Sequence, residues 1–156
     1  MVTRAKTDVD QIRQLLASFH WPEDELVRIS SEMAGLHWQA DITHVLVDVE
    51  RQAEWVSRCT MHFDFCASVT VEHVLSPSAP QPRHSTDISW PGLATIAAIE
   101  CDTILCSSAD HYESLAKVTI RTFVGPRLSI VCAGVRLEWL DIPSEEQRRR
   151  ADIHLA

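Results

Sequence analysis

The chain has 156 residues, of which 46% are hydrophobic and 23% charged, and it contains only four glycines. This composition excludes a disordered or collagen-like chain and is typical of one globular domain, large enough to bury a core without disulfides or a structural metal. Asp and Glu outnumber Lys and Arg by 22 to 14, a net charge of −8, which repels phosphate backbones and favours a basic protein partner over nucleic acid.

The N-terminal segment predicts a helix over about residues 7–19. Thr7 can cap it, and apolar residues then recur at helical spacing. The helix should stop near Trp21-Pro22, because the residue before a proline is pushed out of the α region. We expect its apolar stripe to pack on a sheet through Val9, Ile12, Leu16 and Phe19.

Alternation of apolar and polar residues predicts strands next. Residues 26–30 are a short candidate and residues 42–50 a longer one. From 56 to 74 the alternation is most regular, with Cys59, Met61, Phe63 and Phe65 on one side, which is typical of an antiparallel sheet whose other face is solvated. This stretch exceeds the usual length of one strand, so we expect a bend, a bulge or two strands in succession.

The segment 76–92 holds four of the seven prolines and almost no periodicity, which predicts a loop. After it, residues 93–106 fit neither a strand nor a helix period cleanly, and we assign them to a strand.

The C-terminal third predicts a hairpin. Residues 118–123 form one arm, 124–127 the turn and 128–139 the returning arm, in which Ala133-Gly134 marks a bulge or bend. The remaining residues, 144–156, are a charged tail.

The location of the protein is inferred from what the sequence lacks. No stretch approaches the ~18–20 apolar residues of a membrane span. The N-terminus begins with charged residues, so we expect no export signal and a cytoplasmic protein. The cysteines are odd in number and lie among apolar neighbours, which favours free core thiols in a reducing compartment: Cys59, Cys66, Cys101, Cys106 and Cys132.

Two histidines and two aspartates form the most suggestive cluster. His62 and Asp64 stand two apart on the polar side of one predicted strand, and His44 and Asp48 lie on a strand that could pair with it. Imidazole and carboxylate suit zinc or iron, so one alternative is a small metalloprotein or metal-dependent hydrolase. The simpler interpretation is a solvated sheet face that needs no cofactor, because alternation places polar residues outward in any such sheet.

The motifs give little indication of an enzyme. Residues 114–117 read Ser-Leu-Ala-Lys, in which a lysine one helical turn along could activate the serine, but the companion motifs are missing. The common hydrolase, zinc-protease and phosphate-loop motifs are also missing. Cys59, His62 and Cys66 cannot meet at one zinc on an extended strand, because Cys59 falls on the opposite side.

Five tryptophans accompany a single tyrosine. Trp38, Trp55 and Trp90 lie in predicted connections, where exposure would favour a binding role, since tryptophan is enriched at interface hot spots. Trp139 alternates with apolar residues and is expected in the core.

Two segments resemble a known family. Residues 18–29, Ser-Phe-His-Trp-Pro-Glu-Asp-Glu-Leu-Val-Arg-Ile, look like the opening of small β-rich immunity proteins of bacterial polymorphic toxin systems, where a Ser-Phe-His-Asp-x-Glu-like segment leads into the first strand. Residues 128–135, Leu-Ser-Ile-Val-Cys-Ala-Gly-Val, are similar to that family's closing strand with its Phe-x-Cys-like pattern. The resemblance implies a non-catalytic protein that binds and neutralises a cognate toxin.

The sequence therefore predicts a single domain over residues 1–156 that is mainly β (α+β), an antiparallel sheet or sandwich of about six to eight strands with one N-terminal helix. We expect a non-enzymatic, acidic protein-binding domain, most concretely an immunity protein that binds a basic toxin domain, with no nucleic-acid or membrane partner. A further alternative is an adaptor subunit of a larger assembly, in which the loop 76–92 orders on a partner. The candidate contacts are acidic and aromatic: Glu23, Asp24, Glu25, Asp48, Glu50, Trp55, Asp64 and Trp90.

Overall fold

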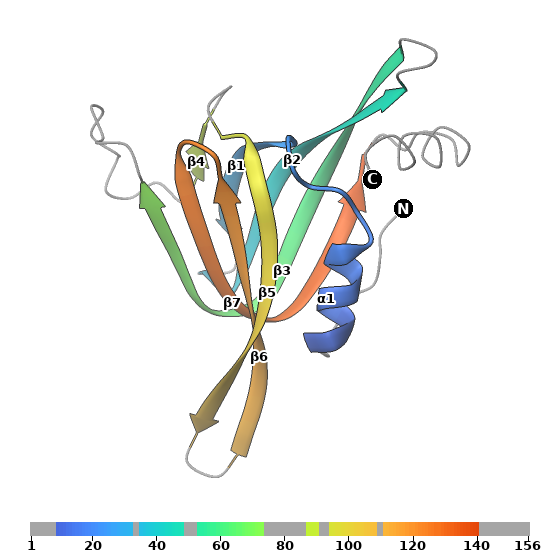
Figure 1. Cartoon of the computed structure of the whole chain (residues 1–156). Coiled ribbons are helices and arrows are strands. Elements are labelled where there is room, and N and C mark those ends of the chain that lie inside the picture. The colour runs from blue at the N-terminus through green and yellow to red at the C-terminus, as the bar shows by residue number, and fades with distance from the viewer. Residues whose placement is uncertain are drawn as a thin grey trace.

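The computed structural model describes residues 9–32, 35–48, 53–73, 87–90, 94–108 and 111–140, and within them the chain forms one helix and seven strands (Figure 1). The elements are α1 (Val9–Ala17), β1 (Glu25–Glu32), β2 (His37–Asp48), β3 (Ala53–His73), β4 (Asp87–Ser89), β5 (Ile96–Ser108), β6 (His111–Thr122) and β7 (Pro126–Trp139). The fold is mainly β with a single antiparallel sheet, as predicted. No helix in this part of the chain is long and apolar enough to span a bilayer.

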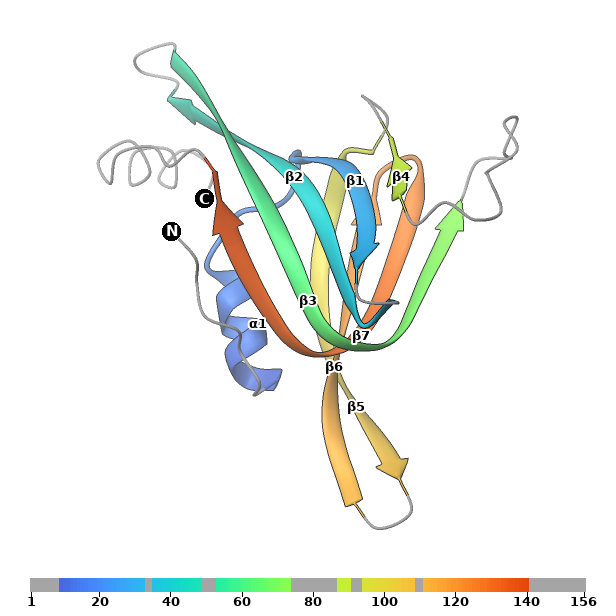
Figure 2. The same cartoon turned by 180° about the vertical axis from the view of Figure 1, so that it is seen from behind.

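The sheet has the strand order β4-β1-β2-β3-β7-β6-β5. It consists of two meanders, β1–β2–β3 and β5–β6–β7, which are joined where β3 pairs with β7. Figures 1 and 2 show how strongly β3 and β7 curve. The curvature brings β5 back to β1, where the Leu26 amide donates to the Ala94 carbonyl at 2.8 Å and the Ile96 amide donates to the Asp24 carbonyl at 2.7 Å.

The apolar core fills the inside of this curve. Helix α1 adds Ile12 and Leu16 to it, and the Arg13 Nε donates to the Cys101 carbonyl of β5 at 3.2 Å. The predicted helix stripe is confirmed, with Phe19 half-buried against Trp139. The largest fully buried side chains come from several strands: Leu26, Ile29, Ile42, Met61, Phe63, Ile96, Val118, Ile120, Leu128, Ile130 and Leu137.

Strand β3 is a single strand with a bulge, one of the three alternatives expected from its length. Its register against β7 shifts between Cys66 and Ser68, and Phe65 adopts a positive φ of 52°. The alternation that buries Met61 and Phe63 breaks here, because the bulged backbone turns the next side chain away from the core. Phe65 is consequently 74% exposed, which corrects its predicted place on the apolar side, and Cys66 packs against the core instead.

Other sequence predictions are refined by the strand pairing. Residues 87–89, assigned to the predicted loop, form β4 and pair with β1, whereas 74–86, 91–93 and the tail lie outside the described residues. The 118–139 hairpin is confirmed by the pairing of β6 with β7. The Ser-x-x-Lys segment is part of β6, so its lysine does not stand one helical turn from its serine.

The cysteines whose side chains are described are free thiols. Cys59 and Cys132 are buried in the core, and burial raises the pKa of each to about 12. Such thiols remain protonated and unreactive at neutral pH. Residue 106 lies in β5, but its side chain is outside the described set.

Candidate functional site

The outward face of β1, β2, β3 and β7 carries a grid of polar side chains. Residues directly opposite one another on paired strands share a face and lie close together. The register therefore aligns two polar rows across the four strands, Ser30–Gln39–His62–Arg136 and Arg28–Asp41–Thr60–Glu138.

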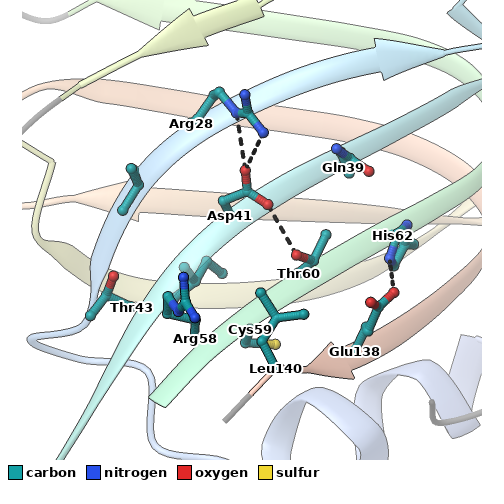
Figure 3. Close-up of a pocket in the computed structure, with 12 residues that line it drawn as sticks. Arg28, Gln39, Asp41, Thr43, Arg58, Cys59, Thr60, His62, Glu138 and Leu140 are labelled. Carbon is teal, nitrogen blue, oxygen red and sulfur yellow. Dashed lines mark hydrogen bonds and ion pairs between the residues drawn. The ribbon is translucent and has the colours of Figure 1, made fainter. Parts of the chain in front are cut away.

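The second row is organised by Asp41. The Arg28 Nε and Nη2 contact the Asp41 Oδ2 at 3.0 and 2.9 Å, and the Thr60 hydroxyl donates to the Asp41 Oδ1 at 3.0 Å (Figure 3). Both oxygens of this carboxylate are occupied, so Asp41 fixes the side chains of the neighbouring strands.

A longer chain of contacts crosses β2, β3 and β7. The Asp64 Oδ1 lies 2.8 Å from the His37 Nδ1, the His37 Nε2 lies 3.1 Å from the His62 Nδ1, and the His62 Nε2 lies 3.0 Å from the Glu138 Oε2. At the Asp64 end of this series, the Arg136 Nε donates to the Asp64 Oδ2 at 3.1 Å. We call Asp64, His37, His62 and Glu138 the histidine chain.

The two imidazoles of the histidine chain are largely withdrawn from solvent. His37 is 8% exposed and His62 is 9% exposed. Burial is the main reason that the pKa of His62 is lowered, and the positive charge of Arg136 and the neighbouring His37 lower it further against an opposing hydrogen bond to Glu138. The solvated face expected here is therefore wrong for His62, which is held in a network instead.

A groove of about 490 Å³ opens beside this network (Figure 3). His62 and Glu138 contribute to its wall, so one end of the histidine chain is exposed to whatever enters it. The groove is lined by Val27, Arg28, Gln39, Asp41, Ile42, Thr43, Arg58, Cys59, Thr60, His62, Glu138 and Leu140.

Two exposed apolar residues adjoin the other end of the histidine chain. Leu36 precedes His37 and is 53% exposed, and Phe65 follows Asp64. The Cys66 amide donates to the Leu36 carbonyl at 2.9 Å, so the two backbones run side by side at this point. We call Leu36 and Phe65 the apolar pair.

The four residues of the alternative metal site, His44, Asp48, His62 and Asp64, are not brought together. In the β2–β3 register, His62 stands opposite Gln39, whereas His44 stands opposite Ser57 and Asp48 opposite Ala53. At about 3.3 Å per residue, the five positions from Gln39 to His44 separate the two levels by about 17 Å. In the described part of the chain, no group of three or more His, Cys, Asp or Glu side chains is arranged to hold a metal ion.

Two of the predicted partner contacts are buried. Asp24 is 2% exposed, because its backbone joins β1 to β5, and Trp90 is 8% exposed, because the chain after β4 runs along β1 and its amide donates to the Val27 carbonyl. Neither can serve as a surface contact, which corrects both predictions. Trp38 is half-buried in β2 rather than in a connection, with its Nε1 donating to the Gly35 carbonyl at 3.0 Å.

The other predicted contacts have mixed outcomes. Glu23 is exposed, Glu25 is half-buried, and Asp64 is engaged by His37 and Arg136. Asp48 and Trp55 lie in β2 and β3, but their side chains are outside the described set, as is all of Glu50.

Sequence reasoning missed His37, Arg136 and Glu138. His37 lies five positions before the predicted start of its strand at residue 42. Arg136 and Glu138 alternate with the core residues Leu137 and Trp139, and this alternation places them on a polar face. It does not show that this face adjoins His62, because that requires the pairing of β3 with β7.

Comparisons with known protein families, with curated protein sequences and with solved structures find no match. The function of the site is therefore argued from its own geometry and charge.

Proposed function

We propose that the chain is a protein-binding domain that uses the apolar pair, Leu36 and Phe65, to engage a partner with a basic surface. The observation that carries this proposal is the exposure of Phe65 on a left-handed backbone. That conformation costs a non-glycine residue about 1–2 kcal/mol. Residues held in such conformations cluster at functional sites, and a phenyl ring displayed to solvent at this cost is best explained by a partner that covers it.

The surroundings of the apolar pair suit a protein interface. Aromatic anchors at the centre and a polar rim are typical of such interfaces. The rim here is the histidine chain together with the exposed Glu32, which pairs in register with His37 on β1. The histidine chain also joins the start of β2, next to Leu36, to the bulged part of β3 that carries Phe65, and a preorganised surface loses less entropy on binding.

The charge of the chain supports the chemistry of the partner. A net charge of −8 accelerates encounter with a basic surface and disfavours acidic competitors. In its more specific form, the proposal is that the partner is a toxin domain and the chain its immunity protein. The resemblance of residues 18–29 and 128–135 to that family supports this form.

The test begins with capture on the tagged chain from its source cells. Phe65→Asn removes the ring, and asparagine tolerates a left-handed backbone, so the fold is retained. Phe123→Asn is the matched control, because Phe123 is also exposed but lies in the turn between β6 and β7. We expect a partner with a basic contact domain that binds the wild type and the control, and binds the Phe65 variant at least about 30-fold more weakly.

The purified partner then allows direct titration. Its affinity for the wild type should fall as salt is raised, because opposite surface charges are screened. A partner that binds the Phe65 variant as tightly as the control variant would contradict the proposed surface. A captured toxin domain whose activity the chain suppresses would support the immunity form, and a partner of another class would refute that form alone.

A further inference from the structure

The contacts of the histidine chain depend on how many protons it holds. Its three contacts, Asp64 to His37, His37 to His62 and His62 to Glu138, all lie between 2.8 and 3.1 Å. Each such contact is a hydrogen bond only if one hydrogen lies between its two atoms. The histidine chain therefore needs three hydrogens, one for each of its three contacts.

Neutral imidazoles cannot supply all three. An ionised carboxylate only accepts, and a neutral imidazole carries one N–H. His37 would donate its hydrogen to Asp64, and His62 would donate its hydrogen to Glu138. Two nitrogen lone pairs would then face each other across the 3.1 Å between His37 and His62.

Adding two protons to the neutral pair also leaves the contact between His37 and His62 unsatisfied, for the opposite reason. With both imidazoles charged, an N–H on His37 points at an N–H on His62, and two positive charges lie side by side. One extra proton is the count that satisfies every contact. The four groups then carry a net charge of −1, with the imidazolium held between two carboxylates.

The surroundings make departures from this count costly. An unsatisfied polar contact is expensive where water is excluded, and both rings are buried. The charged groups that face the pair come from three strands: Asp64 on β3, Arg136 and Glu138 on β7, and Glu32 on β1 as the register partner of His37. The pKa of His62 is lowered, chiefly by burial, so a positive charge on both rings at once is further disfavoured.

We propose that His37 and His62 share a single proton, and that loss of this proton or gain of another breaks their contact and releases the apolar pair, so that binding is strongest within a window of pH. The link to binding is structural: His37 and Asp64 are the immediate neighbours of Leu36 and Phe65, and the Cys66 amide joins their backbones. The binding part of this inference rests on the proposed function, whereas the shared proton is a property of the free protein.

The free protein provides the first measurement. The nitrogen chemical shifts of the imidazoles, followed by NMR across the pH range in which the chain stays folded, report where each proton resides. We expect His37 and His62 to take up their protons in two separate macroscopic steps, with one proton on the pair between them. Independent uptake by the two rings in a single step would overturn the shared proton, and so would a pair that stays neutral throughout.

Glu138→Gln makes the test specific. The new amide can donate to the His62 Nε2, so the hydrogen of His62 moves to its Nδ1 and points at the His37 Nε2. Every contact is then satisfied without an extra proton. We expect this variant to hold one proton fewer in the window and to keep the His37–His62 contact at alkaline pH. Glu100→Gln is the matched control, because Glu100 is paired with Arg121 on the β5–β6 side of the sheet, and it should leave the titration unchanged.

Binding provides the second measurement. With the captured partner, wild-type affinity should fall about tenfold on each side of the window, the equivalent of one broken buried hydrogen bond. Glu138→Gln should remove the alkaline decline only. If the titration shows two steps but the affinity does not change with pH, the proposed pH control of binding is wrong and the proposed function is unaffected. A two-step titration without any Phe65-dependent partner would overturn the proposed function and leave the shared proton standing.

Discussion

Replacing Phe65 by alanine and by glycine isolates the backbone conformation on which the proposed surface depends. Both substitutions remove the same ring, so the hydrophobic loss is shared. Only glycine adopts a φ of 52° without a steric penalty. We expect the glycine variant to be the more stable of the two, which reverses the order found in an ordinary strand.

The magnitude follows from exposure and backbone geometry. With 74% of Phe65 exposed, roughly 50 Å² of a ~200 Å² side chain is covered, and its removal costs about 1.2 kcal/mol in both variants. In a regular strand, glycine is less stable than alanine by about 0.5–1 kcal/mol. At Phe65, alanine carries the left-handed penalty of about 1–2 kcal/mol, so glycine should lead by about 0.5–1 kcal/mol.

Urea unfolding of four variants measures this difference. Thr70→Ala and Thr70→Gly form the matched pair, because Thr70 is an exposed residue of the same strand that lacks a positive φ. The difference in unfolding free energy between the glycine and alanine variants should change by about 1–2 kcal/mol from Thr70 to Phe65. It is calculated from the urea midpoints at constant m-value. If alanine is the more stable substituent at both positions, Phe65 is not strained, and the argument that its display reflects function fails.

Three further outcomes follow from burial and pKa. Cys59, whose pKa is raised to about 12, should resist alkylation in the folded chain and react in urea. Its contribution to the free energy of unfolding should fall as pH rises above 9.0, because the unfolded thiol loses its proton first. Because the pKa of His62 is lowered, the unfolded chain binds more protons than the folded chain at acid pH, so stability should fall as pH drops below 6.5, and His62→Gln should flatten that decline in urea unfolding. Trp21→Phe removes a buried 2.7 Å bond to the Leu16 carbonyl at the end of α1 and should cost about 1–3 kcal/mol in thermal unfolding. Trp38→Phe should cost less, because the half-buried Gly35 carbonyl that it leaves can bind water.

Local patterns predicted the elements of the fold well. The helix stripe and the apolar side of β3 from Cys59 to Phe63 depend on residues near in sequence, and both are confirmed. The length of β3 indicated an interruption, either a bend, a bulge or a break into two strands, and the structure has a bulge. Its consequence for Phe65 did not, because alternation carries no information about a positive φ.

The site depends on strand order, which local patterns do not contain. His62 and Glu138 are 76 positions apart and meet only because β3 pairs with β7. The same lack of information on strand order explains the incorrect predictions for His44 and Trp90. Grouping His44 with His62 requires a strand register that the sequence does not contain, and nothing near Trp90 in the sequence indicates that the chain there runs along β1.

The position of β7 governs the order in which the chain can assemble. It is the last strand of the described chain, yet it lies between β3 and β6 in the sheet. Before β7 is added, β3 and β6 each expose the edge that β7 will cover, and the two halves of the sheet are joined through the bonds of Ala94 and Ile96 to Leu26 and Asp24. Contacts between such distant segments form slowly, and open edges invite aggregation while they wait. The sheet is consequently complete only after residues 126–139 have been synthesised, and the β3 and β6 edges stay open until then.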